Sequence, residues 1–119
     1  MANVLLTGFP SFTAQLVIER LVNQGDHVQV LVRHRFRDEA ETFLRQVPGP
    51  GTSEVLLGDV TLMDLGLRGP QVRRLIQEVE YMYHLATVYP LSKRSHEAHS
   101  VNVEGTRFIL DLALSADRL

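Results

Sequence analysis

The sequence predicts an α/β fold in which a parallel sheet of about four strands carries helices on both faces. Short apolar runs alternate with longer amphipathic segments four times along the chain. Turn-forming residues separate these segments, most clearly at Gly25 and at the run Pro48-Gly49-Pro50-Gly51. Its 119 residues are enough for one domain with a real hydrophobic core.

The first half of the chain predicts two strands, each followed by a helix. Residues 3–7 are a short apolar run and predict a buried strand. Apolar residues then recur at helical spacing up to Gly25, which is placed to end that helix. Residues 27–32 predict the second strand, and a helix is expected over residues 38–46.

The second half repeats the pattern. Residues 54–58 predict a third strand that ends at Asp59, and residues 71–79 suit a helix. Residues 80–88 predict a fourth strand, and a last helix is expected from about Ser95 to Ala116. This alternation implies right-handed crossovers between parallel strands, so the carboxyl ends of all four strands should meet at one edge of the sheet.

The composition excludes several classes of protein. The formal net charge of −2 favours neither a nucleic-acid nor a membrane-surface role, since both usually need a basic excess. There is no cysteine, which excludes disulfide scaffolds and thiolate chemistry. No apolar run approaches the roughly 20 residues of a membrane span, and the first residues lack the charged region of a signal peptide. We expect a cytoplasmic protein.

A turn that suits a phosphate group follows the first strand. A strand that ends at Thr7-Gly8 and enters a helix within a few residues directs backbone N–H groups and a helix N-terminus at one point. The dinucleotide fingerprint has glycine at three positions, here held by Gly8, Ser11 and Ala14. The Ser11 hydroxyl either bonds a phosphate or crowds it out, and such turns also occur in proteins that bind no cofactor.

The second strand ends in basic residues. Sites for NAD usually place an acidic side chain near this position to bind the ribose 2′-OH, whereas this chain has Arg33, with Arg35 and Arg37 behind it. A guanidinium group matches a phosphate dianion. The arginines therefore indicate a clamp for the 2′-phosphate of NADP; the alternative is a solvated basic loop balanced by Asp38, Glu39 and Glu41.

Four segments in this order resemble the extended short-chain dehydrogenase/reductase family. They are Thr7-Gly8-Phe9-Pro10-Ser11-Phe12-Thr13-Ala14, Gly58-Asp59-Val60-Thr61, His84-Leu85-Ala86-Thr87 and Val101-Asn102-Val103-Glu104-Gly105-Thr106. The stretch from Gly58 to Leu67 and the pattern around residues 101–106 are most similar to its thioester-reductase and male-sterility-like branch. The resemblance implies a partial Rossmann fold.

The resemblance also implies one cofactor site, for NADP with NAD as the alternative. Its expected residues are Gly8, Phe9, Pro10, Ser11, Phe12, Arg33, Asp59, Val60, Leu85, Ala86 and Thr87. Residues 8–12 would hold the pyrophosphate, Arg33 would select the phosphorylated cofactor, and residues 59–60 would flank the adenine. Residues 85–87 would line the ribose and nicotinamide side, with Asn102 as a polar brace in the last helix.

Each of these roles has a structural alternative. Asp59 could cap the turn that follows it, Ala86 could simply ease packing, and Asn102 could be an exposed helix residue. His84 is interpreted as a packed histidine of the fourth strand rather than a base. His96 and His99, three residues apart, are interpreted as surface histidines, because no third metal ligand is evident.

The resemblance implies catalytic groups that this chain does not show clearly. The family uses a Ser or Thr after a fifth strand and a Tyr-x-x-x-Lys pair, in which an ammonium makes a phenol more acidic. The segment from Tyr89 to Lys93 has the spacing, but Pro90 disfavours helical geometry at Tyr89. Residues 1–119 are therefore expected to form an incomplete NAD(P)-binding Rossmann domain without the catalytic and substrate-binding part.

The favoured interpretation is that the chain is the NADP(H)-binding part of an oxidoreductase that reduces a carbonyl or thioester in a full-length parent. The chain alone is expected to be inactive. One alternative is a non-catalytic module that binds or senses NADP(H). Another is a fragment of an NDP-sugar epimerase or dehydratase. The expected partner is a dinucleotide, with neither nucleic acid nor membrane. Self-association is expected through an exposed fourth strand or the last helix.

Overall fold

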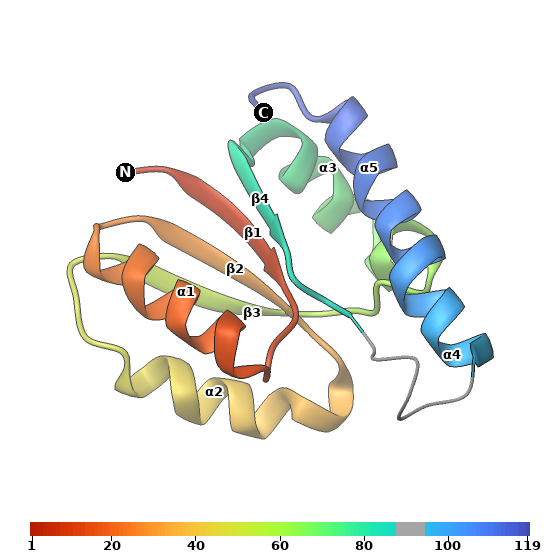
Figure 1. Cartoon of the computed structure of the whole chain (residues 1–119). Coiled ribbons are helices and arrows are strands. Elements are labelled where there is room, and N and C mark those ends of the chain that lie inside the picture. Colours follow the sequence, from red (N-terminus) through yellow and green to blue (C-terminus); the bar gives the residue numbers. More distant parts are fainter. Residues whose placement is uncertain (88–94) are drawn as a thin grey trace.

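Four parallel strands form one sheet in the computed structural model, which describes residues 1–87 and 95–119. The strands are β1 (Asn3–Thr7), β2 (His27–Val32), β3 (Thr52–Leu57) and β4 (Tyr81–His84). Their order is β3-β2-β1-β4, so β1 is central and pairs with β2 on one side and β4 on the other (Figure 1). This arrangement confirms the expected α/β class with a parallel sheet.

Helices cover both faces of the sheet. On one face lie α1 (Phe12–Asn23) and α2 (Arg37–Gln46), and on the other lie α3 (Gly69–Glu78) and α5 (Gly105–Ser115) (Figure 1). Shorter helical turns complete the chain: η1 (His34–Phe36), η2 (Met63–Gly66), α4 (Ser95–His99) and the π-helical segment η4 (Ser100–Glu104). No helix in the described ranges combines the length and the apolarity that a membrane crossing needs.

The hydrophobic core lies in two layers because the strands bury side chains on both faces. Val4, Leu6, Val28 and Val30 point toward α1 and α2, where they pack with Ile18. The opposite layer joins strand residues to α3, α5 and the loop after β3, and its buried members include Leu5, Leu31, Leu56, Val60, Leu65, Leu75, Val101 and Ile109. The alternation of β1 between the two layers follows from the two-residue period of a strand.

Most element boundaries agree with the sequence pattern to within two residues, but β4 is shorter than predicted. It was expected over residues 80–88 and ends at His84. The N–H groups of Leu85 and Ala86 both donate to the Thr7 side-chain hydroxyl, at 3.1 and 3.2 Å. The Leu85 N–H also donates to the Thr7 backbone carbonyl at 3.2 Å, so backbone pairing with β1 ends at Leu85. Residue 88 lies outside the described residues.

The carboxyl ends of the strands and the chain termini lie at opposite ends of the sheet (Figure 1). At the carboxyl end, the loops that follow β1, β2, β3 and β4 come together. Open parallel sheets bind their ligands at this end, where successive loops diverge. The fold thus brings the four segments of interest, which are far apart in the sequence, to one edge.

Candidate functional site

A cleft of about 550 Å³ opens at the carboxyl ends of the strands. It is lined by Thr7, Gly8, Phe9, Pro10, Ser11, Thr13, Leu31, Arg33, Arg35, Phe36, Gly58, Asp59, Val60, Leu85, Ala86, Thr87 and Val101. Every residue that the sequence predicted for the site lines this cleft except Phe12. The structure therefore brings together side chains from the loops after all four strands.

Gly8 forms the turn that opens the cleft. Its φ is +110°, a conformation that residues with a side chain rarely adopt. A Cβ added there would lie 2.8 Å from both the backbone carbonyl carbon and the Cβ of Leu85. The turn is closed by a hydrogen bond of 3.0 Å from the Ser11 N–H to the Gly8 carbonyl. Glycine is therefore required for the backbone path and for contact with the segment after β4.

Ser11 is exposed at the start of α1 and lines the cleft. Its hydroxyl oxygen accepts a hydrogen bond of 3.1 Å from the Ala14 N–H and so caps the helix. A hydroxyl that accepts one bond can still donate its own hydrogen, so it remains able to bind an anion. The helix N-terminus itself attracts negative charge.

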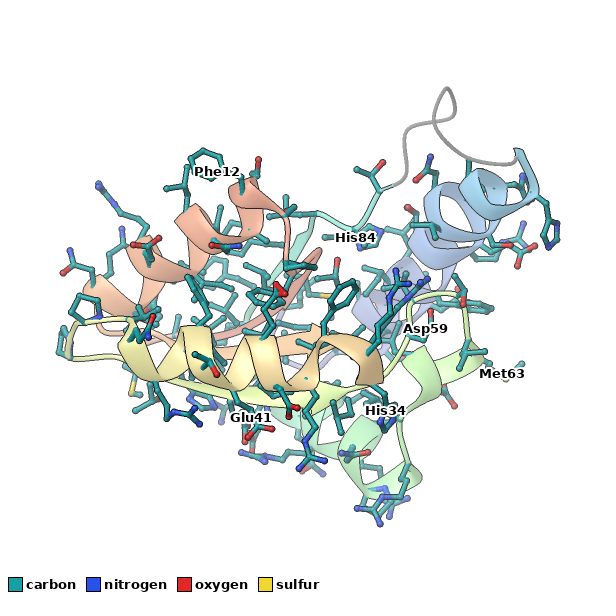
Figure 2. All side chains as sticks on the ribbon, turned by 90° about the horizontal axis from the view of Figure 1, so that it is seen from below. Phe12, His34, Glu41, Asp59, Met63 and His84 are labelled. Atoms are coloured by element: carbon teal, nitrogen blue, oxygen red, sulfur yellow. The ribbon has the colours of Figure 1, made fainter. Side chains whose placement is uncertain are left out.

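Phe12 does not line the cleft. Its side chain is 75% exposed and points into solvent from the first turn of α1 (Figure 2). Phe9 instead is buried, with its ring 5.6 Å from that of Phe43 between centroids, which fixes the turn to α2. Among the residues expected at the pyrophosphate, Phe12 is therefore the one that does not line the cleft.

The arginines after β2 separate into two groups. Arg33 and Arg35 line the cleft, and the Arg35 guanidinium lies 4.6 Å from the centroid of the Phe36 ring. Arg37 lies outside the cleft and pairs with Glu41, with 2.9 Å between Nε and Oε1. The predicted basic cluster therefore contributes two of its three guanidinium groups to the cleft.

Asp59 lies beside Arg33, and both line the cleft. The Arg33 Nη2 atom lies 3.6 Å from Asp59 Oδ1. The same Oδ1 atom accepts hydrogen bonds from the Thr61 N–H at 2.9 Å and from the Thr61 hydroxyl at 2.7 Å. The capping alternative for Asp59 is thus confirmed, while its carboxylate still lines the cleft.

The sequence analysis missed Thr7, whose hydroxyl connects β1 to β4. It accepts the N–H groups of Leu85 and Ala86, and its Oγ1 lies 2.7 Å from His84 Nδ1. Because the Thr7 oxygen already accepts these two N–H groups, its own hydrogen is donated to His84 Nδ1. The signal available in the sequence was a threonine directly before the turn glycine.

His84 is the last residue of β4, and its ring lies toward the last helix (Figure 2). Its Nε2 atom is 3.1 Å from the hydroxyl oxygen of Thr106, and that hydroxyl donates to the Asn102 carbonyl at 2.9 Å. Nε2 therefore carries the proton and Nδ1 accepts, which is the neutral form of the ring. Burial lowers the pKa of His84 below its ordinary value of 6.5. Both ring nitrogens serve the structure, in agreement with the interpretation of His84 as a packed histidine.

The π-helical segment brings the last helix to the cleft. The Thr87 hydroxyl donates to Asn102 Oδ1 at 3.1 Å, so Asn102 connects the last helix to the segment after β4. A Cβ added at Gly105 would lie 3.0 Å from Val60 Cγ2, so the helix packs closely on the loop after β3. Val60 is buried in this contact while still lining the cleft.

Two further candidates, His96 and His99, lie outside the cleft. The segment from Tyr89 to Lys93 lies outside the described residues. His96 and His99 are exposed on α4, and His99 Nε2 lies 3.8 Å from Glu104 Oε1. In the ranges 1–87 and 95–119, no group of three or more potential metal ligands is found.

Two curated proteins with similar sequences are reductases. A carboxylic acid reductase from Segniliparus rugosus is 33% identical over 130 residues, which cover 94% of this chain and 11% of that protein. Fatty acyl-CoA reductase 1 from Gallus gallus is 26% identical over 128 residues, which cover 93% of this chain and 25% of that protein. The chain thus spans a quarter or less of the length of these relatives.

Solved structures share the fold. The terminal R domain of the myxalamid PKS-NRPS pathway superimposes with a TM-score of 0.79 at 24% identity, covering 95% of this chain and 31% of that one. The reductase domain of a nonribosomal peptide synthetase from Mycobacterium tuberculosis gives a TM-score of 0.75 at 24% identity, covering 100% of this chain and 31% of the other. The family model described as "Male sterility protein", an NAD-binding family, matches residues 6–119. The chain therefore belongs to the NAD(P)-binding male sterility protein family.

Proposed function

We propose that the chain is the NADP(H)-binding part of a reductase that acts on a carbonyl or thioester. One observation carries this proposal: the same cleft is lined by residues at the N-terminus of α1 and by Arg33 and Arg35. The helix N-terminus suits a pyrophosphate, and the guanidinium groups suit a 2′-phosphate. The names of the relatives, a carboxylic acid reductase and a fatty acyl-CoA reductase, support the reductive direction.

The donor set of the cleft fits such a cofactor. Backbone N–H groups of the turn that begins at Gly8, together with the Ser11 hydroxyl, would hold the pyrophosphate. Arg33 and Arg35 would hold the 2′-phosphate, and Asp59 with Val60 would flank the adenine. Residues 85–87 would line the ribose and nicotinamide side, where Thr87 is held by Asn102.

A bound nicotinamide dinucleotide supplies the hydride in this class of reaction. Within the described part of the chain, the cleft is lined by hydroxyl, guanidinium and carboxylate groups, without a phenol or an ammonium. The described residues are thus suited to binding and orienting the cofactor. The proton transfer that accompanies hydride transfer would need groups other than these.

The same observation favours a second candidate, a module that binds or senses NADP(H) without catalysis. The two candidates differ in turnover by the protein that carries this chain. Reduction of an acyl thioester with consumption of NADPH would support the reductase, whereas tight NADPH binding without turnover by that protein would support the sensing module. Measurable reductase activity from these 119 residues alone would contradict both.

Calorimetric titration of the chain with NADP⁺ and NAD⁺ tests the cofactor assignment. We expect NADP⁺ to bind at least about ten-fold more tightly, since charge-assisted bonds to a phosphate contribute about 1.5–3 kcal/mol. Arg33→Ala should remove most of that preference. Arg37→Ala is the matched control, because Arg37 pairs with Glu41 outside the cleft. Equal affinities for both cofactors, unchanged in Arg33→Ala, would contradict the proposal.

We also propose self-association through β4 or α5, in a cytoplasmic protein. Tyr81 and Tyr83 of β4 are 57% and 38% exposed, and β4 lies at an edge of the described sheet. On α5, Leu110 is 57% exposed. Tyr83→Lys and Leu110→Lys separate the two surfaces in analytical ultracentrifugation. A strictly monomeric wild-type chain at high concentration would contradict both.

A further inference from the structure

Arg33 and Asp59 line two cavities. One is the cleft described above, and the other is a smaller cavity of about 380 Å³. The smaller cavity is lined by Arg33, His34, Arg35, Leu57, Gly58, Asp59, Leu62 and Gly66. The two cavities share Arg33, Arg35, Gly58 and Asp59. The ion pair therefore stands where the adenosine end of a cofactor would meet the loops after β2 and β3.

We propose that Asp59 limits how strongly the site discriminates in favour of a 2′-phosphate, because it holds Arg33 in an ion pair that the phosphate has to break. This inference rests on the proposed binding of NADP(H). It assigns Asp59 a role in specificity that is distinct from capping the loop and from contact with adenine.

The geometry of the pair shows which partner can move. Asp59 Oδ1 is fixed by two hydrogen bonds from Thr61, at 2.9 and 2.7 Å. Its distance of 3.6 Å from Arg33 Nη2 is that of an ion pair without a short hydrogen bond. The Arg33 side chain is 37% exposed, and no hydrogen bond of its guanidinium is found among the described residues. The arginine is thus the mobile partner, and it can turn from the carboxylate to a phosphate.

The charge of Asp59 opposes phosphate binding in two ways. It neutralises Arg33 in the free protein, and it remains close to the site at which Arg33 would hold the phosphate dianion. Two parallel bonds from a guanidinium to a phosphate are stronger than a single loose ion pair, so the exchange is favourable overall. The carboxylate nevertheless reduces the net gain, and its removal should raise the preference for phosphorylated ligands.

Asp59→Asn is a suitable variant because the amide oxygen can still accept both bonds from Thr61. The probes are adenosine 2′,5′-bisphosphate and adenosine 5′-monophosphate, which differ only in the 2′-phosphate. The ratio of their dissociation constants cancels any effect on adenine. We expect Asp59→Asn to raise the preference for the bisphosphate by roughly three-fold, the scale of a partly exposed ion pair. Glu41→Gln removes the same charge from the Arg37–Glu41 pair and should leave the ratio unchanged.

Asp59→Asn in an Arg33→Ala background distinguishes the effect of the Arg33–Asp59 ion pair from direct repulsion between the Asp59 carboxylate and the 2′-phosphate. If Asp59 acts by holding Arg33, the three-fold effect should largely disappear there. An equal increase in both backgrounds, or no increase with Arg33 present, would overturn the inference. If Arg33→Ala alone leaves the wild-type ratio unchanged, the proposed NADP(H) site fails first.

A measurement on the wild-type chain keeps the inference testable if a variant does not fold. The side-chain NMR signals of Arg33 should shift on addition of the bisphosphate and stay in place with the monophosphate. Identical responses to the two probes would show that Arg33 does not leave Asp59 for the phosphate, which would overturn the inference.

Discussion

Gly8 and Leu85 lie so close together that the chain has no room for a side chain at position 8. A Cβ there would come within 2.8 Å of the Leu85 backbone, at a φ of +110°. The contact joins the turn after β1 to the segment after β4, and both segments line the cleft. The same glycine therefore determines both the shape of the site and the docking of the strands.

Gly8→Ala should reduce the free energy of unfolding by at least about 2 kcal/mol, because it adds backbone strain to a steric clash. The affinity for NADP⁺ should also fall in the molecules that remain folded, because the turn has to open to relieve the contact with Leu85 and its N–H groups then move away from the ligand. Chemical denaturation and calorimetric titration measure the two effects. Gly69→Ala is the control, because a Cβ there meets only the far end of the Arg73 side chain, at 3.3 Å. Normal stability and normal NADP⁺ binding of Gly8→Ala would contradict the assigned role.

Thr7→Val should be destabilising even though the side chains are nearly equal in size. The substitution leaves the Ala86 N–H and the His84 Nδ1 atom without their partner, whereas the Leu85 N–H keeps its bond of 3.2 Å to the Thr7 backbone carbonyl. A buried polar group left unsatisfied costs about 1–3 kcal/mol. Thr7→Ser keeps the hydroxyl and should recover most of the loss in a urea denaturation series. Equal stability of Thr7→Val and the wild type would show that the hydroxyl network does not stabilise the strand end.

Stability should fall as the pH drops below neutrality, because the pKa of His84 is lowered by burial. The folded chain then binds the proton less readily than the unfolded chain does, so the neutral ring stabilises the fold above the unfolded value of about 6.5. That contribution is lost as the pH falls from there toward the lower pKa of the folded state. Thermal unfolding between pH 7.5 and 5 measures the slope. His84→Gln should flatten the slope, and an unchanged slope in that variant would contradict the argument.

The loop that carries Asp59 depends on a left-handed turn. Asp64 and Leu65 have φ values of 53° and 59°, and the Leu65 carbonyl accepts the Asp59 N–H at 2.8 Å. A β-branched residue in this conformation is strained, so Asp64→Val should cost about 1–3 kcal/mol of stability. Met63→Val is the matched control, because Met63 is exposed beside the turn without a positive φ (Figure 2). Equal stability of the two variants would show that the turn carries no strain.

The fold was predictable because the periodicity in this chain is strong and local. Apolar strands such as residues 27–32 and the helix ended by Gly25 carry their own signals, and the structure has both at the expected positions. The meeting of the four segments at one sheet edge followed from parallel topology alone. The residues expected at the site, apart from Phe12, therefore line one cleft.

The remaining features depend on contacts between distant residues. The hydroxyl of Thr7 bonds a segment 78 and 79 positions away, which no local pattern encodes. The exposure of Phe12 depends on the direction in which α1 leaves the turn. The division between Arg35 in the cleft and Arg37 outside it follows from where η1 ends and α2 begins.

The central claim is that the turn after β1 binds the anionic part of a dinucleotide, and backbone NMR tests it most directly. In a titration of the ¹⁵N-labelled chain with NADP⁺, the amide signals of Gly8, Ser11, Phe12 and Thr13 should shift most, together with those of residues 33–36. A saturating titration in which these amides stay in place, or in which the shifts cluster around Arg45 and Ser53 in a separate cavity beside β3, would contradict the account.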